Sequence, residues 1–153
     1  MIDDTLLAAY RATRYTVLLP GGELPGGELV VRIGEFSPAM DALLTSERAA
    51  SATFVTAWNP MSRPVPKKAN TAAQKRLETE LASAGHRWLP QEGRADAGDW
   101  PPEPGCLVLG LTRERALGLA ERYGQNAVVW CVPGSEPELL LTRLAGKGAV
   151  SEY

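Results

Sequence analysis

The sequence predicts an α+β fold: a ferredoxin-like split βαβ core (βαββαβ) whose antiparallel sheet carries both helices on one face. Between about residues 52 and 132, segments with strand or helix patterns follow in the order strand, helix, strand, strand, helix, strand. The predicted helices repeat apolar residues every three or four positions, whereas the predicted strands alternate or are continuously apolar. The chain has 153 residues, the size of one ordinary domain, so we expect a single domain over residues 1–153.

The first 51 residues are predicted to add a helix, a strand hairpin and a second helix to this core. DDTLLAAYRA places acids at the start of a short helix, and RYTVLLP and ELVVRI have the composition of strands. Between these strands PGGEL occurs twice in tandem, which predicts a lengthened hairpin loop because Pro-Gly-Gly cannot continue a strand. Ser37 followed by Pro38 is a typical helix start, so a helix is expected over about 38–49.

The first core strand is predicted over SATFVTAW, where the alternation continues to Trp58. NPMSRPVPKKAN follows with three prolines and is expected to be a loop. Thr71 and Gln74 form a capping box, so the next helix should begin near Thr71 and end before Gly85. Its apolar stripe is formed by Ala73, Leu77, Leu81 and Ala84.

The second half of the core contains one more helix, which Thr112 should cap and Gly124 should end. RADAGDWPPEPG is expected to be a polar loop. The remaining core strands are predicted over HRWLPQEGR, CLVLGL and NAVVWCV, with PELLL as a hairpin partner of the last. From about residue 142 we expect a loose tail, because few structural signals remain.

Charge and hydropathy exclude several classes of protein. Sixteen Lys+Arg against eighteen Asp+Glu give a formal net charge of −2, whereas nucleic-acid-binding domains usually carry a basic stripe, so no nucleic-acid partner is expected. No apolar run approaches the roughly 20 residues that span a bilayer. The N-terminus has acids where a signal peptide needs bases. We therefore expect a soluble cytoplasmic protein with no membrane partner.

No metal, cofactor or redox site is predicted. Cys106 and Cys131 lie inside strongly apolar runs without a CxxC spacing, so both are expected to be buried, free thiols. His86 is the only histidine, and a metal site or a catalytic triad needs more partners than it has nearby.

Polar side chains gather where predicted elements end, and they are the candidate site. In the connection between the first core strand and the next helix, amides, a hydroxyl and cations precede a helix N-terminus, whose free N–H groups suit an anion. YGQNAVVW adds two amides at a second junction between helix and strand. The candidate ligand-binding residues are Trp58, Asn59, Ser62, Arg63, Lys68, Asn70, Gln125 and Asn126. The alternative is that these residues only form turns, helix caps and a solvated surface.

A second candidate is an acid cluster, formed by Glu92, Asp96, Asp99 and Glu103 around Trp100. Paired carboxylates can serve acid/base chemistry or bind a divalent cation. Their spacing matches no recognised metal loop, so the alternative is a soluble turn-forming loop. The sequence does not fix the distance from this loop to Asn59.

Four stretches, YRATRYTVLLPGG, TAWNPMS with the later Asn70, GDWPPEP and YGQNAVVW, together resemble a family of small bacterial proteins, the domain of unknown function 3293 family. The resemblance extends from about residue 7 to about 141. The motif positions are Tyr15, Asn59, Pro60, Ser62, Asn70, Asp99, Glu103, Gln125 and Asn126. Of these, the resemblance implies that Asn59, Ser62, Asn70, Gln125 and Asn126 form a shared pocket. Where relatives carry a histidine in the acidic loop this chain has Asp99-Trp100, so no role built on that histidine transfers. The family has no established activity.

Three functions are compatible with these observations. The leading hypothesis is the binding of a small polar or anionic ligand, a nucleotide or metabolite, at the TAWNPMS and GQN strand ends. The second is a protein-interaction or regulatory (inhibitor-type) module, or a homodimer that pairs through a sheet edge. The third is a hydrolase-like enzyme that uses Asp99 or Glu103 as a general base. No catalytic constellation is recognisable, so the sequence does not decide whether the protein is an enzyme.

Overall fold

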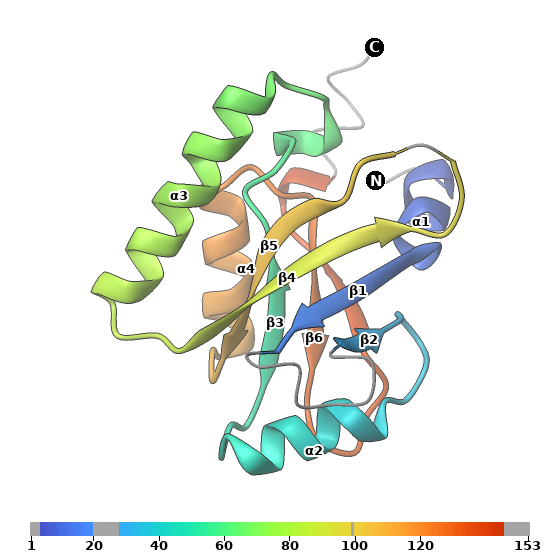
Figure 1. Cartoon of the computed structure of the whole chain (residues 1–153), viewed down its shortest axis with the longest axis vertical. Coiled ribbons are helices and arrows are strands. Elements are labelled where there is room, and N and C mark those ends of the chain that lie inside the picture. The colour runs from blue at the N-terminus through green and yellow to red at the C-terminus, as the bar shows by residue number, and fades with distance from the viewer. Residues whose placement is uncertain (1–3, 20–27, 99, 146–153) are drawn as a thin grey trace.

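Seven antiparallel strands in one curled sheet and four α-helices make up the part of the chain that the computed structural model describes, residues 4–19, 28–98 and 100–145 (Figure 1). The helices are α1 (Asp4–Arg11), α2 (Pro38–Ser46), α3 (Lys67–Ser83) and α4 (Arg113–Arg122). The strands are β1 (Thr13–Leu18), β2 (Glu28–Val31), β3 (Ala52–Val55), β4 (Trp88–Ala95), β5 (Glu103–Leu109), β6 (Ala127–Cys131) and β7 (Glu138–Leu141). The predicted α+β class is confirmed.

The strand order in the sheet is β2-β1-β4-β5-β3-β6-β7, and neighbouring strands of this described sheet pair antiparallel. The first core strand, β3, therefore lies between β5 and β6. The N-terminal hairpin extends the sheet from β4, and β7 extends it from β6. Cys106 and Cys131 lie on β5 and β6, which are not neighbours; both thiols are free and buried, and burial raises the pKa of each to about 12.

Two apolar cores lie on opposite faces of the sheet. Leu77 of α3 and Leu119 of α4 pack with Val108 of β5 against one face, and Figure 1 shows the two helices covering that side. Met40 and Leu44 of α2 belong to the core on the other face. Each fully buried leucine contributes roughly 1.5–3 kcal/mol, so burial on both faces stabilises the sheet.

The curl of the sheet is the main difference from the predicted fold. Tyr15 of β1 and Phe54 of β3 have ring centroids 5.6 Å apart, although β4 and β5 lie between their strands. Across a flat sheet three strand spacings amount to about 14 Å. The loops at the two sheet edges also meet, because the Gly34 N–H donates to the Pro137 carbonyl over 2.9 Å.

A glycine allows the close approach of backbone and side chains within this curl. A Cβ at Gly105 of β5 would lie 2.7 Å from the Val55 carbonyl oxygen and would overlap the Gln91 side chain. A backbone carbonyl cannot move away as a flexible side chain can, so only glycine fits this position.

Strand β3 ends at Val55, three residues before the predicted end at Trp58. Thr56 hydrogen-bonds instead of continuing the ladder: its Oγ1 donates to the Pro104 carbonyl (2.6 Å) and accepts from the Trp58 N–H (3.0 Å). Pro104 has no N–H, so the facing strand offers no further donor at this point.

Helix α3 begins at Lys67, four residues before the predicted start at Thr71. Pro66 occupies the cap position without any side-chain hydrogen bond, and its fixed φ of −56° already suits a helix start. Thr71 is therefore an exposed residue of the second turn, and the predicted capping box is wrong.

We expect Thr71→Ala to change the unfolding free energy by less than about 0.5 kcal/mol, as is usual for exposed helix positions. Ser37→Ala is the matched control, because Ser37 Oγ accepts from the Met40 N–H over 3.0 Å at the start of α2. Losing that cap should cost about 1 kcal/mol. Thermal unfolding of both variants gives the comparison, and equal losses would contradict the position of the α3 start.

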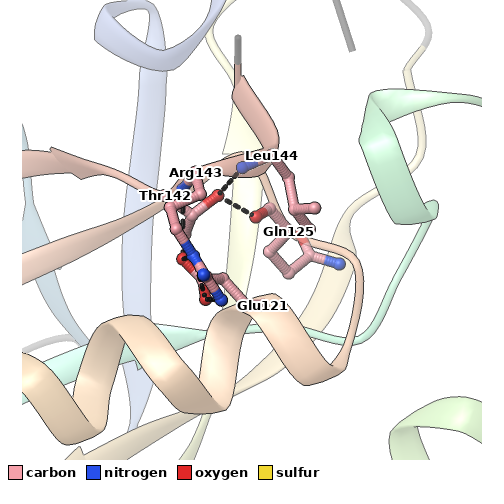
Figure 2. Close-up of polar contacts among 5 residues, drawn as sticks. All are labelled: Glu121, Gln125, Thr142, Arg143 and Leu144. Atoms are coloured by element: carbon pink, nitrogen blue, oxygen red, sulfur yellow. Dashed lines mark hydrogen bonds and ion pairs between the residues drawn. The ribbon is translucent and has the colours of Figure 1, made fainter. Parts of the chain in front are cut away.

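Residues 142–145 of the expected loose tail are packed against the fold (Figure 2). Thr142 Oγ1 donates to the Gln125 carbonyl (2.7 Å) and accepts from the Leu144 N–H (3.3 Å). Arg143 binds the Glu121 carboxylate at 2.8 Å. The rest of that tail, residues 146–153, most of the tandem PGGEL copy (20–27) and Asp99 lie outside the described residues. Within the described ranges no helix is long and apolar enough to cross a membrane.

Candidate functional site

Asn59 and Asn70 bond to each other across the β3–α3 connection. Asn70 Nδ2 donates to Asn59 Oδ1 (2.8 Å), and the Asn59 N–H donates to Asn70 Oδ1 (2.7 Å). Asn59 Oδ1 also accepts from the Val65 N–H (3.2 Å). The two amides thus hold the loop onto the first turn of α3, and both of their side-chain oxygens are engaged within the protein.

The 3₁₀ turn Pro60–Ser62 has an unusual backbone. Asn59, Met61 and Ser62 have φ values of 46°, 59° and 58°, in the left-handed region. Each such residue other than glycine costs of order 1–3 kcal/mol, least for asparagine, and persists only where its surroundings hold it. Here the Met61 N–H donates to the Gly124 carbonyl over 2.6 Å, which docks the turn on the end of α4.

Gln125 and Asn126 lie beside this turn, so the structure brings the two predicted junctions together. Gln125 Nε2 donates to the carbonyls of Trp58 (3.2 Å) and Tyr123 (3.1 Å), which joins β3 to the end of α4. Its own carbonyl accepts from the Thr142 hydroxyl (Figure 2), and the Thr142 N–H donates to the Asn126 carbonyl over 2.9 Å. The C-terminal segment therefore fixes the backbone of both residues.

Asn126 differs from Asn59, Asn70 and Gln125 because its side-chain oxygen is buried without a partner, as that of Gln91 on β4 also is. Its Nδ2 donates to Ser62 Oγ over 3.1 Å. Its Oδ1 is buried and, within the described residues, accepts no hydrogen bond, although the residue is only 4% exposed. Buried polar atoms without a partner are rare in native proteins, so this oxygen requires an explanation.

Tyr10, Tyr15 and Glu103 lie within electrostatic reach of one another. Burial raises the pKa of Tyr10, and a side-chain hydrogen bond with Ser62 lowers it. Burial also raises the pKa of Tyr15, and the neighbouring Tyr10 and Glu103 raise it further. Burial raises the pKa of Glu103, whose Oε2 accepts from Trp100 Nε1 over 2.8 Å.

We call the group formed by Tyr10, Ser62, Trp100, Glu103 and Asn126 the polar junction. Its residues come from α1, the 3₁₀ turn, the start of β5 with the loop before it, and the position that precedes β6. Tyr10 was not among the predicted site residues, although it belongs to the YRATRYTVLLPGG stretch, because no local pattern links it to Ser62, more than fifty positions later.

Part of the chain is similar to a known protein family. Residues 55–128 match the model of a family described as a protein of unknown function, DUF3293. The chain resembles DUF3293 over this range. No curated protein and no solved structure matches the chain.

The DUF3293 range confirms the expected resemblance over a shorter part of the chain than residues 7–141. It begins at the last residue of β3 and ends inside β6, so it contains Ser62, Glu103 and Asn126. Tyr10 and Tyr15 come from α1 and β1, outside that range. The polar junction therefore joins the DUF3293 segment to the N-terminal elements.

The remaining predicted site residues lie outside the polar junction or at its edge. Arg63 and Lys68 are exposed, and Trp58 is half-buried with its backbone engaged by Thr56 and Gln125. A hollow of about 510 Å³ lies elsewhere, beside α1. Its lining contains none of the eight predicted ligand-binding residues: Asp4, Leu7, Ala8, Arg11, Ala12 and Asp96.

The predicted acid cluster is divided among separate partners. Glu92 pairs with Arg94 (3.0 Å), and Asp96 pairs with Arg32 (2.6 Å). The hydrogen bond from Arg32 lowers the pKa of Asp96. Among the described residues, which exclude Asp99, no group of three or more His, Cys, Asp or Glu side chains could hold a metal ion. Glu103 is the acid of this group that lies at the polar junction.

We expect Glu103→Gln to stabilise the protein at pH 7 and to have little effect near pH 4, below the usual glutamate pKa of about 4.3. Burial raises the pKa of Glu103 in the folded protein, so the native state favours the protonated carboxyl. The stability that this preference provides is fully present at low pH. It is lost as the pH rises through the pKa of the folded state. Glutamine is neutral at both pH values and keeps an acceptor for Trp100.

Urea unfolding at the two pH values measures this difference. Glu92→Gln is the matched control, because Glu92 has the Arg94 partner and its loss should lower stability or leave it unchanged at pH 7. A Glu103→Gln variant that is less stable than wild type at pH 7 would show that the charged carboxylate supports the fold.

Proposed function

We propose that the protein binds a small polar ligand at the polar junction. The observation that carries this proposal is the buried Asn126 Oδ1, which has no hydrogen-bond partner among the described residues. A buried acceptor without a donor costs about 1–3 kcal/mol. A ligand that donates to this oxygen would recover that cost on binding, which explains why the fold retains an amide there.

The neighbours of Asn126 support the same proposal. Ser62 and Trp100 are exposed, so the junction can be reached from solvent, while Tyr10 and Glu103 are partly buried beside them. Three left-handed residues hold the Ser62 side chain in place at a cost in stability. Strained residues and unpaired polar atoms concentrate at functional sites, where the fold gives up stability for function.

The available atoms favour a polar ligand over an anionic one. Asn126 Oδ1 and the Glu103 carboxylate are acceptors, and an anion offers them no donor. The predicted cations, Arg63 and Lys68, are exposed side chains of the connection and the first turn of α3. A phosphate or carboxylate at the polar junction would therefore face hydrogen-bond acceptors and not positive charge.

A thermal-shift screen of neutral, cationic and anionic metabolites tests the proposal. A ligand at 100 times its dissociation constant stabilises the protein by about 2.7 kcal/mol, which corresponds to roughly 5–11 °C for a chain of this size. We expect the shift to disappear in Asn126→Leu and to persist in Lys68→Ala. A shift that survives Asn126→Leu and is lost in Lys68→Ala would instead place the ligand at the start of α3.

A second candidate function is pairing with another protein chain through a sheet edge. Val30 of β2 and Leu141 of β7 are 46% and 44% exposed, and these strands form the two edges of the sheet. Exposed apolar edge strands can add a further strand. Light scattering after size-exclusion chromatography tests this: a dimer that Leu141→Lys dissociates would support it, and a concentration-independent monomer would exclude self-association.

We also infer that the core is a ferredoxin-like unit within the curled sheet. In support, the four core strands follow the order β4-β5-β3-β6, and α3 and α4 share one apolar core on a single face. In that order β3 lies between β5, the second strand of the β4–β5 hairpin, and β6, the strand that follows α4. A split βαβ arrangement has the same order.

A further inference from the structure

We infer that the ligand of the polar junction is a small organic cation with N–H donors, such as a primary amine or a guanidinium compound of metabolite size. This inference rests on the proposed function and deepens it, because it assigns a charge and a hydrogen-bonding pattern to the ligand. It follows from hydrogen-bond needs, from charge and from the aromatic side chains of the site.

Hydrogen-bond needs come first. Asn126 Nδ2 donates to Ser62 Oγ over 3.1 Å. Its Oδ1 is left without a donor among the described residues. Glu103 is a second acceptor, with Trp100 as the donor to its Oε2. An ammonium or guanidinium group carries only donors and would match both of these acceptors.

Charge points the same way. In the described part of the chain, ion pairs with arginine are formed by Glu47, Glu80, Glu92, Asp96, Glu121 and Glu138. Glu103 is absent from these pairs, and no cation contributes to its pKa. A partly buried carboxylate without a positive partner gains most from a ligand that supplies one.

Aromatic side chains near Glu103 also favour a cation. Tyr10 and Tyr15 lie within electrostatic reach of its carboxylate, and Trp100 bonds to it while remaining 52% exposed. The faces of tryptophan and tyrosine rings attract cations, with a gain of about 0.5–2 kcal/mol. An exposed tryptophan next to an unpaired acid thus offers a cation both a carboxylate and a ring face.

Three compounds with the same carbon frame separate the effect of charge: phenethylamine (cation), 2-phenylethanol (neutral) and phenylacetate (anion). We would titrate each into ¹⁵N-labelled protein at low salt and follow the indole N–H of Trp100 and the side-chain amide of Asn126 by NMR. We expect phenethylamine to shift both signals, at least tenfold weaker affinity in Glu103→Gln, and weaker binding at high salt. Tetramethylammonium has no N–H and should bind more weakly than phenethylamine.

The outcomes distinguish this inference from the proposed function. Binding of 2-phenylethanol or phenylacetate at these two signals, without binding of phenethylamine, would overturn the cation inference and keep the polar junction as a ligand site. Phenethylamine binding that Glu103→Gln leaves unchanged would also overturn it. If phenethylamine shifts neither signal, the inference fails, and the metabolite screen with Asn126→Leu then decides the proposed function separately.

Discussion

Gly124→Ala is expected to lower the unfolding free energy by about 2–4 kcal/mol. Gly124 has φ +69°, and a left-handed backbone costs an alanine about 1–2 kcal/mol. In addition, its Cβ would lie 2.8 Å from Pro60 Cβ, so the 3₁₀ turn would have to move away from α4, at a further cost of about 1–2 kcal/mol. The melting temperature should fall by roughly 4–16 °C.

Gly118→Ala is the matched control for this experiment. Gly118 lies inside α4, and a Cβ there would meet nothing within 4 Å. Alanine is preferred to glycine in a helix by about 0.5–1 kcal/mol, so this variant should be more stable than wild type. If Gly124→Ala melted like Gly118→Ala, the turn would not be docked on the end of α4 as described.

Asn70→Ala is expected to cost about 2–3 kcal/mol. Asn70 is 3% exposed, and its side chain forms two hydrogen bonds with Asn59. Each bond contributes about 0.5–1.5 kcal/mol, and the partly buried Asn59 N–H would lose its partner. Equilibrium urea unfolding measures the loss. The neighbouring exposed Thr71 provides the comparison: if Asn70→Ala lost no more than Thr71→Ala, the amide pair would not hold the loop onto α3.

Local patterns predicted the helices, the strands and their order. Ser37 and Thr112 cap α2 and α4 as expected, because an N-cap depends on residues that are close in sequence. The α3 start was predicted too late, because Pro66 and Lys67 begin the helix without a side-chain cap signal. The curl could not be predicted, since it depends on contacts between strands, such as that of Tyr15 with Phe54.

The site was predictable in part for the same reason. The sequence indicates that Asn59, Asn70, Gln125 and Asn126 stand at element ends, but all four looked alike. Their hydrogen bonds separate them: the first three are engaged with one another or with backbone, whereas Asn126 Oδ1 is unpaired within the described residues. Tyr10 reaches Ser62 across more than fifty positions in sequence, so no local pattern points to it.

The central claim is that the Asn126 amide oxygen is kept for a ligand and is not needed by the fold. The most direct measurement compares the unfolding free energies of Asn126→Leu and Gln125→Met, which replace adjacent amides by apolar side chains of similar size.

We predict that Asn126→Leu is as stable as wild type or more stable, because the buried acceptor without a partner is removed and solvent can replace the donor at the exposed Ser62. Gln125→Met should lose about 1–3 kcal/mol, because its amide nitrogen binds two carbonyls. A loss in Asn126→Leu as large as that in Gln125→Met would contradict the claim and assign Asn126 to the fold.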